Sequence, residues 1–425
     1  VDLITDTSAP NTVVDAVIDH MTDKAAMPVD AAAYDPAGSS AVGRCSKCHM
    51  VKTSKSAVYS EDAAGFLKGD IHGHTFLPVW PNVSKLDGVT NSCNGCHPLS
   101  GTDETQTIIE DWSSDPNENG TFHADTPRNF QNGVANHNRD GGVACVSCHT
   151  TQGFIEVQVF GTDIHDLTGD EDKDARDEMV RRSLQQDKGI ACDACHGKQS
   201  DGTFAAGDNP LRFPKADLCG KCHNNETVLY EDYVADGEIV RHPQANMLAG
   251  MDGGEIAGDT YGNTAHTNAA TDKCVTCHFN QNANGTHTFM PTIESCQQCH
   301  PGLTTFNRTA RADYDGSGTT DGIQTEIEGV LEILKSAILA ATPSTGATIE
   351  YMDPYFEING ENDNTGDLDA TADAALMRAI FNHYWVTFDA SGGIHNTEYA
   401  LQLMQNSYEE LTGTDWNTGT GGTKR

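Results

Sequence analysis

Seven copies of one five-residue pattern constrain this chain more than any other feature. All 14 cysteines fall into C-x-x-C pairs, and a histidine directly follows each pair. The copies, each written as two cysteines and a histidine, are Cys45, Cys48 and His49; Cys93, Cys96 and His97; Cys145, Cys148 and His149; Cys192, Cys195 and His196; Cys219, Cys222 and His223; Cys274, Cys277 and His278; and Cys296, Cys299 and His300. Because no cysteine is left over, all the thiols serve one kind of chemistry.

C-x-x-C-H is the attachment sequence of c-type haem. Two thiols at this spacing bond the two vinyl groups of one porphyrin, and the adjacent imidazole becomes the proximal ligand of the iron. A redox dithiol or half of a zinc site also uses C-x-x-C, but neither requires the histidine every time. Zinc ribbons pair their C-x-x-C units, which would leave one of the seven over. The sequence therefore predicts seven covalently bound haem c groups.

The composition agrees with this prediction. Only 37% of the residues are hydrophobic, and 62 Asp+Glu against 26 Lys+Arg give a formal net charge of −36. A core this poor in apolar side chains needs another source of apolar volume, which porphyrins supply. The acidity excludes nucleic acid as a partner, and no apolar run is long enough to span a membrane.

We expect three regions and a multihaem cytochrome fold, mostly irregular coil with short α-helices wrapped on covalent haems, plus a small all-α C-terminal region. Residues 1–43 are a haem-free N-terminal arm with an amphipathic helix from Asn11 to about Lys24. Residues 44–300 are the heptahaem domain, whose unequal motif spacing argues against a tandem repeat. Residues 301–425 contain no cysteine and form the haem-free helical region.

Apolar spacing in that last region predicts three helices, over residues 323–339, 371–388 and 397–411. The first has the clearest apolar face, which includes Ile327, Val330 and Leu334. The Gly/Thr-rich tail from Thr412 is expected to be flexible unless it docks on the rest of the protein.

Histidine is also the expected second ligand of each iron. Of the 18 histidines, seven are proximal and eleven remain, whereas seven bis-histidine haems would use seven of the eleven. By their context, the distal candidates are His74, His137, His242, His266, His287 and His395, followed by His165, His123 and His20. His72 and His383 are expected to be structural or to bond a haem propionate. Methionine is the alternative ligand, but none of the ten has a comparable context.

An iron with two protein ligands has no open position for a substrate, but it can gain and lose an electron with little rearrangement. We therefore expect an electron-transfer protein and not an enzyme. A haem reductase or oxidase would need one five-coordinate haem, and the sequence has no altered motif, such as Lys in place of His, that would mark one. A non-redox structural or adhesive protein would leave the seven haems without a purpose.

A calcium-binding pattern follows the last haem motif. The oxygen-bearing residues Asp313, Asp315, Ser317, Thr319 and Asp321 alternate along the chain as the ligands of an EF-hand-type loop do. Gly318 occupies the sharp-turn place. The twelfth place is Gln324, so the bidentate carboxylate is missing or comes from Glu326 or Glu328. The pattern predicts one structural Ca²⁺, and the alternative is an ordinary Asp/Gly turn.

Taken together, these residues resemble secreted multihaem c-type cytochromes of metal-respiring bacteria. The resemblance rests on the seven motifs, the His-Thr-Phe segments at His74 and His287, the His242-Pro-Gln stretch, the 313–321 loop followed by Gly322-Ile-Gln, and Gly393-Ile-His395-Asn. It covers most of residues 44–410. It implies electron transport across or beyond the outer membrane. Some members polymerise into filaments in which a histidine of one subunit ligates a haem of the next.

Two assemblies are open at this point. A conductive homopolymer would use the surplus of histidines, with His20 on the haem-free arm reaching a neighbour. The alternative is a monomeric carrier that exchanges electrons with other redox proteins or extracellular acceptors. Covalent haem without a spare thiol indicates an extracytoplasmic place, extracellular or at the outer surface. The start at Val1 is expected to reflect cleavage of a signal peptide.

Overall fold

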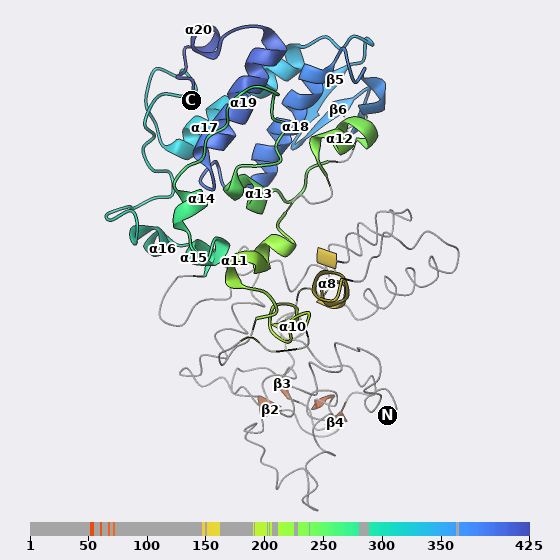
Figure 1. Cartoon of the computed structure of the whole chain (residues 1–425), viewed down its shortest axis with the longest axis vertical. Helices are drawn as coiled ribbons and strands as arrows, with labels where there is room; N and C mark the ends of the chain where they lie inside the picture. Colours follow the sequence, from red (N-terminus) through yellow and green to blue (C-terminus); the bar gives the residue numbers. More distant parts are fainter. Residues whose placement is uncertain are drawn as a thin grey trace, which may run out of the picture. The chain divides into compact units, whose positions relative to one another are not determined.

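The computed structural model of the chain describes residues 147–148, 151–161, 190, 192–201, 203, 205, 211–224, 228–237, 239–279, 289–362 and 365–425, and the backbone of four short strands within 52–72 (Figure 1). The chain divides into two compact units, which we describe separately. The N-terminal unit comprises Val1–Pro214 and His278–Pro291, and the C-terminal unit comprises Lys215–Cys277 and Thr292–Arg425.

This division differs from the three regions expected from the sequence. The helical region beyond residue 300 packs with residues 215–277, which carry two of the seven C-x-x-C pairs. The predicted arm of residues 1–43 and its helix lie outside the described residues.

In the described part of the N-terminal unit, regular structure is sparse. Strand β1 (Lys52–Ser54) pairs antiparallel with β4 (Ile71–His72), and β2 (Ser60–Glu61) with β3 (Leu67–Lys68). Helix α8 (Thr151–Phe154) continues as the π-helical turn η3 (Ile155–Val159), and α10 (Cys192–Cys195) is one turn long. The short helices of this described part agree with the expected fold.

The short elements of the C-terminal unit come first in the chain. They are α11 (Lys215–Leu218), the 3-10 turn η4 (Cys219–Lys221), α12 (Tyr230–Asp236), α13 (Gln244–Ala249), α14 (His266–Ala269), α15 (Cys274–His278), whose last residue belongs to the other unit, and α16 (Ile293–Gln297). Each of the three C-x-x-C pairs here lies on or directly beside one of them.

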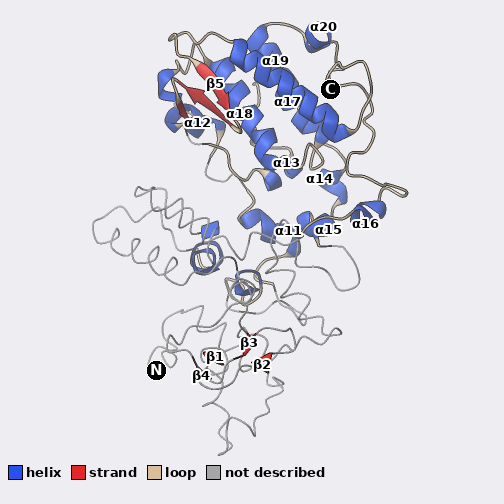
Figure 2. Ribbon diagram, turned by 180° about the vertical axis from the view of Figure 1, so that it is seen from behind, coloured by secondary structure: helices blue, strands red, loops and turns tan. Residues whose placement is uncertain are grey.

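Three long helices form the core of the C-terminal unit: α17 (Ile323–Ala340), α18 (Ala374–Asp389) and α19 (Thr397–Thr412) (Figure 2). In α17, the buried Ile327, Val330, Leu334 and Ile338 recur at spacings of three and four residues, which places them on one face. Burying each such side chain stabilises the fold by roughly 1.5–3 kcal/mol. The helices expected over 323–339 and 397–411 are thus confirmed.

Helix α18 begins three residues later than the sequence predicts. The Asp369 carboxylate accepts hydrogen bonds from the backbone N–H groups of Thr371 (2.9 Å) and Ala372 (2.7 Å). A side chain that binds nearby backbone groups in this way favours a turn over a helix. Helix formation therefore starts only at Ala374.

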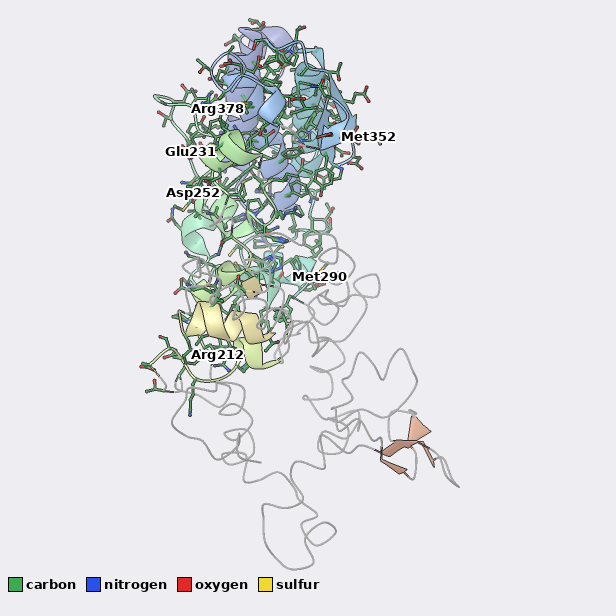
Figure 3. All side chains as sticks on the ribbon, turned by 90° about the vertical axis from the view of Figure 1, so that its right-hand side faces the viewer. Arg212, Glu231, Asp252, Met290, Met352 and Arg378 are labelled. Carbon is green, nitrogen blue, oxygen red and sulfur yellow. The ribbon has the colours of Figure 1, made fainter. Side chains whose placement is uncertain are left out.

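A three-stranded antiparallel sheet, absent from the expected all-α region, packs beside α17 and α18. It contains β5 (Ile349–Met352), β6 (Tyr355–Ile358) and β7 (Glu361–Asn362), with β6 in the centre. The turn η5 (Thr365–Asp367) follows it. Figure 3 shows the exposed Met352 at one side of this unit and Arg378 at the other.

The tail beyond Thr412 is docked. Asp415 caps α20 (Trp416–Thr420) by accepting a hydrogen bond from the Thr418 N–H. The Trp416 side chain is fully buried, and its indole N–H donates to the carbonyl of Tyr314 at 3.1 Å. The tail therefore fixes the acidic loop that begins at Asp313.

Candidate functional site

Three C-x-x-C-H segments occupy the described part around the C-terminal unit. In the 219–223 segment the His223 N–H donates to the Cys219 carbonyl at 2.9 Å, and in the 296–300 segment the His300 N–H donates to the Cys296 carbonyl at 2.9 Å. An i to i−4 bond of this kind makes one helical turn, which brings the cysteines and the histidine to one side of the backbone. The turn thus presents two thiols and an imidazole together.

His242 lies opposite His223. Their ring centroids are 6.2 Å apart, and the ring planes are nearly perpendicular at 80°. Helix α13 starts just after His242, and the Ala245 N–H donates to the carbonyl of His223 at 2.9 Å. This bond ties the distal candidate and the 219–223 segment into one local structure.

His266 lies opposite His300 in the same manner. The centroids are 5.9 Å apart, with an interplanar angle of 81°. The His266 Nδ1 lies 2.7 Å from the carbonyl oxygen of Ile394, in the loop between α18 and α19. Because a carbonyl can only accept, Nδ1 carries the proton and Nε2 keeps its lone pair for a metal. Burial, Arg308 and His266 lower the pKa of His300, which favours the neutral, ligating form.

Both separations fit two imidazoles that share one iron. A metal–nitrogen bond of about 2.0–2.1 Å on each side, together with the depth of each ring, separates the centroids by about 6 Å. Edge-to-face packing of the rings alone also gives such distances. The hydrogen bond that fixes the His266 tautomer therefore supplies the discriminating feature. The residues present fit the haem that the sequence predicts.

A third candidate, His395, stands at the start of α19. Its Nδ1 lies 2.6 Å from Oδ1 of Asp389, a carboxylate that is 2% exposed. Ser391 donates its hydroxyl to the other Asp389 oxygen. Burial lowers the pKa of His395, but the bond and charge of Asp389 prevail and raise it.

The cysteines of the three segments lie near one another within the C-terminal unit. The pKa of Cys274 is lowered to about 6, chiefly by a hydrogen bond with Cys219. Burial raises this pKa, and the charge of His395 lowers it further. Burial, and then Cys296 and Cys299, raise the pKa of Cys277. A cavity of about 210 Å³ lies between the first two segments, lined by Gly220, Lys221, Ala245, Leu248, Lys273 and Cys274.

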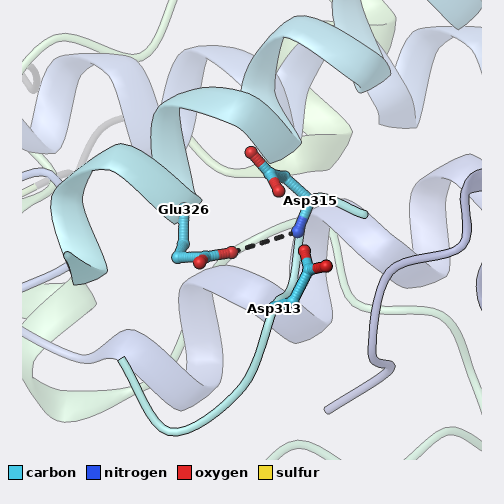
Figure 4. Close-up of side chains that lie close together, drawn as sticks. All are labelled: Asp313, Asp315 and Glu326. Atoms are coloured by element: carbon cyan, nitrogen blue, oxygen red, sulfur yellow. Dashed lines mark hydrogen bonds between the residues drawn. The ribbon is translucent and has the colours of Figure 1, made fainter. Parts of the chain in front are cut away.

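The acidic loop forms a separate cluster. Carboxylate oxygens of Asp313, Asp315 and Glu326 lie within 4.8 Å of one another (Figure 4). Of the two glutamates that the sequence offered, Glu326 joins the cluster and is fully buried, whereas Glu328 is exposed.

Backbone groups already hold these carboxylates in place. Glu326 accepts hydrogen bonds from the N–H groups of Tyr314 (2.6 Å), Asp315 (3.2 Å) and Asp321 (2.7 Å). Ser317 and Thr319 instead bond within the loop, since the Thr319 hydroxyl donates to Asp321 at 2.9 Å. The cluster has oxygen ligands of the kind that Ca²⁺ prefers.

His383 is buried in the helical core, as expected for a structural residue. Its ring packs edge-on against Phe356 (5.1 Å between centroids) and Tyr351 (5.9 Å). Burial, and secondarily the charge of Lys335, lower its pKa to about 3.

In the N-terminal unit, the 192–196 segment has a described neighbour. The Arg212 N–H donates to the carbonyl of Cys195 at 2.9 Å, and the buried Arg212 guanidinium donates to the carbonyl of Lys198 at 2.9 Å. In this unit the His278 Nδ1 also lies 2.8 Å from the carbonyl of Phe289, so Nδ1 carries the proton, as in His266.

Many expected site residues lie outside the described part of the chain, so the structure does not place them. They are Cys45, Cys48, His49, Cys93, Cys96, His97, Cys145 and His149, and the distal candidates His20, His74, His123, His137, His165 and His287. Only the backbone of Cys192 and His72 is described.

Two solved structures resemble the chain. One is the outer cell wall cytochrome OcwA, with 18% identity and a TM-score of 0.46 over 87% of this chain. The other is an undecahaem cytochrome from the S-layer of Carboxydothermus ferrireducens, with 19% identity and a TM-score of 0.43 over 69% of this chain. Both are cytochromes. The chain spans 64% and 40% of their respective lengths.

No family model and no curated protein matches the chain. Among the residues that the structure describes, no helix is both long and apolar enough to cross a bilayer.

Proposed function

We propose that this protein transfers electrons outside the cytoplasm through seven covalently bound haem c groups, each with two histidine ligands. When bound, the haem iron supplies reversible one-electron transfer. Each C-x-x-C pair would bond one porphyrin through its two thiols, and the adjacent histidine and a second histidine would ligate the iron. Two protein ligands on every iron would leave no coordination position for a substrate.

In the described part, His223 pairs with His242, and His300 pairs with His266. The observation that carries the proposal is the geometry at His266: a ring 5.9 Å from that of His300, with its Nδ1 already bonded to Ile394. Of its two ring nitrogens, only Nε2 is then free to ligate, and the neighbouring C-x-x-C pair supplies the thiols.

The test uses holoprotein from a host that attaches c-type haem. Denatured mass should exceed that of the polypeptide by seven haems. The reduced protein should keep its absorption spectrum when carbon monoxide is added, because every iron is six-coordinate. A mass increase of fewer haems would contradict the count, and a spectral shift would reveal an open haem.

A multihaem reductase is the competing function. It requires one iron that lacks a distal ligand, and the carbon monoxide experiment detects such an iron directly. For the two described segments whose histidines lie in the C-terminal unit, the candidates His242 and His266 are enough to fill both distal positions. This sufficiency favours electron transfer.

For assembly, we propose a homopolymer in which His20 of one subunit ligates a haem of the next, and a monomeric carrier is the alternative. The support is the surplus of histidines in the sequence. Electron microscopy should show filaments for the wild-type holoprotein and dispersed particles for His20→Ala. Dispersed particles for both would favour the monomer. The partners would then be other redox proteins or extracellular acceptors.

We also propose one structural Ca²⁺ at Asp313, Asp315 and Glu326, close to the predicted ligands Ser317, Thr319 and Asp321. Three carboxylates within 4.8 Å of one another repel unless a cation or proton compensates them. The ion would fix the start of α17 and the docked tail.

A further inference from the structure

We propose that Asn396 positions His266 as the second axial ligand of the haem attached at Cys296 and Cys299. This inference rests on the proposed function and assigns a role to a residue outside every haem motif. All four residues belong to the C-terminal unit. Three observations carry it: the hydrogen bonds of the Asn396 amide, the packing at the end of α13, and the packing of the loop that precedes Asn396.

The side chain of Asn396 bonds to residues on both sides of His266. Asn396 is fully buried, and its Oδ1 accepts a hydrogen bond from the Thr264 N–H at 3.0 Å. Its Nδ2 donates to Oδ1 of Asn263 at 2.5 Å and to the Thr267 hydroxyl oxygen at 3.4 Å. Because an asparagine amide both donates and accepts, this one side chain holds the chain immediately before and after His266.

The end of α13 packs against the same amide. The Thr267 hydroxyl donates to the carbonyl of Leu248 on α13 at 2.8 Å. Gly250, which ends α13 with φ +70°, lies so close that a Cβ there would be 1.8 Å from Oδ1 of Asn263 and 2.8 Å from Nδ2 of Asn396. This close packing leaves the segment that carries α14 little freedom to move.

The loop before Asn396 supplies the bond that sets the tautomer of His266. The Ile394 carbonyl accepts the Nδ1–H of His266 at 2.7 Å. Gly393 has φ +81°, and a Cβ there would lie 2.7 Å from Cγ1 of Ile327, so the loop packs closely on α17. The carbonyl that bonds the ring and the amide that holds the ring's segment are only two residues apart on this loop. Together they fix both the place and the orientation of the imidazole.

The Asn396 oxygen also caps α19. The Tyr399 N–H donates to Oδ1 of Asn396 at 3.4 Å, as at a helix N-cap. Serine caps helices about as well as asparagine does, but it has no amide N–H groups to donate. Asn396→Ser therefore keeps a capping oxygen while it removes the bonds to Asn263 and Thr267.

The test titrates the reduced holoproteins with carbon monoxide, after the haem content of each variant has been measured. Asn396→Ser should weaken the binding of His266 to iron roughly 10- to 100-fold, the usual effect of losing a group that orients a metal ligand. One haem should then bind carbon monoxide at a concentration that leaves the wild-type spectrum unchanged. His266→Ala provides the signal of a fully vacant position.

Asn382→Ser is the matched control. Asn382 is an equally buried asparagine on α18 that accepts from the Gly254 N–H at 2.8 Å and donates to the Gly254 carbonyl at 2.9 Å. It also donates to the Ser407 hydroxyl at 2.8 Å. These bonds hold residue 254 and not the residues beside His266. Asn382→Ser should therefore lower stability without opening a haem to carbon monoxide.

The double variant His266→Ala/Asn396→Ser tests whether Asn396 acts through His266. It should bind as much carbon monoxide as His266→Ala alone, because a positioning residue has no further effect once its ligand is gone. Binding at a second haem in the double variant would show that Asn396 acts elsewhere, and it would overturn the inference.

The outcomes also separate this inference from the proposed function. Carbon monoxide binding by the wild type would overturn the proposed function. An unreactive wild type, together with an Asn396→Ser variant that behaves as Asn382→Ser does, would overturn the positioning role alone.

If Asn396→Ser does not fold, Gly250→Ala perturbs the same amide from the end of α13. Gly413→Ala is its control, since Gly413 ends α19 with a similar φ of +65° but has nothing within 4 Å of the added Cβ. Gly250→Ala should open a haem to carbon monoxide, and Gly413→Ala should not. Equal behaviour of the two variants would overturn the inference.

Discussion

The Nδ1 of His266 lies 2.7 Å from the carbonyl oxygen of Ile394, and this contact joins two parts of the chain that are 128 residues apart. His266 is a candidate haem ligand, whereas Ile394 belongs to the region without cysteine. The contact indicates a role for that region: its α18–α19 loop orients ligands for the neighbouring C-x-x-C-H segments.

His266→Ala should leave one haem with a vacant axial position. The substitution removes the ring that faces His300 at 5.9 Å. The variant should bind carbon monoxide at one haem when reduced, and imidazole should compete with it. His383→Phe is the control, because His383 lies in the aromatic core. A His266→Ala variant that binds no carbon monoxide, or a His383→Phe control that does bind it, would contradict the assignment.

Gly393→Ala should destabilise the C-terminal unit by more than about 1 kcal/mol, because an L-residue is strained at positive φ and the new Cβ collides with Ile327. Gly346→Ala is the matched control, since Gly346 has the same φ of +81° but nothing within 4 Å of the added Cβ. Chemical denaturation measures both variants. Equal losses would show that the close approach to Ile327 has no energetic effect.

Calcium should raise the thermal unfolding temperature of the wild-type holoprotein, because a ligand bound only to the folded state stabilises it. Asp315→Asn removes one carboxylate and should abolish the calcium response while the protein still folds. Asp369→Asn, a carboxylate in a different turn, is the control. A wild type that unfolds at the same temperature with calcium and with chelator would contradict a calcium site.

Stability should fall as the pH falls below about 6.5, and His383 should contribute to this fall. Its pKa is about 3 when folded and near 6.5 when unfolded, so the unfolded state binds an extra proton between these values. The contribution is fully present above pH 6.5 and is lost at up to about 1.4 kcal/mol per pH unit. His383→Phe should flatten the slope of unfolding free energy between pH 6 and 4. An identical slope would contradict the burial of a neutral imidazole.

The spacing of apolar residues predicted the long helices but not the sheet or the exact start of α18. The apolar period identified α17 and α19 closely, because their packing is local to one helix face. The sheet was missed, although the alternating burial of β6, with Phe356 and Ile358 inward, is a signal of period two. The start of α18 was placed too early because Asp369 captures two backbone N–H groups, an effect that apolar spacing does not register.

The candidate site also has residues that the sequence predicted and residues that only the structure reveals. The cysteines and proximal histidines follow from a fixed local motif, and context alone favoured His242, His266 and His395. Pairing each candidate with its segment needs contacts such as that between His266 and His300, which are 34 residues apart in the chain. Glu326 joins the acidic cluster because α17 turns it inward, and its neighbour Glu328 outward. Asp389 left no signal in the sequence, since only the α18–α19 loop brings it to His395.

The most direct measurement is an experimental density map of the holoprotein that locates every iron and its two axial atoms. The account predicts seven irons, each between two imidazole nitrogens, with His223 opposite His242 and His300 opposite His266. An iron that has solvent or an empty position on its distal side, or a different partner for His266, would contradict it.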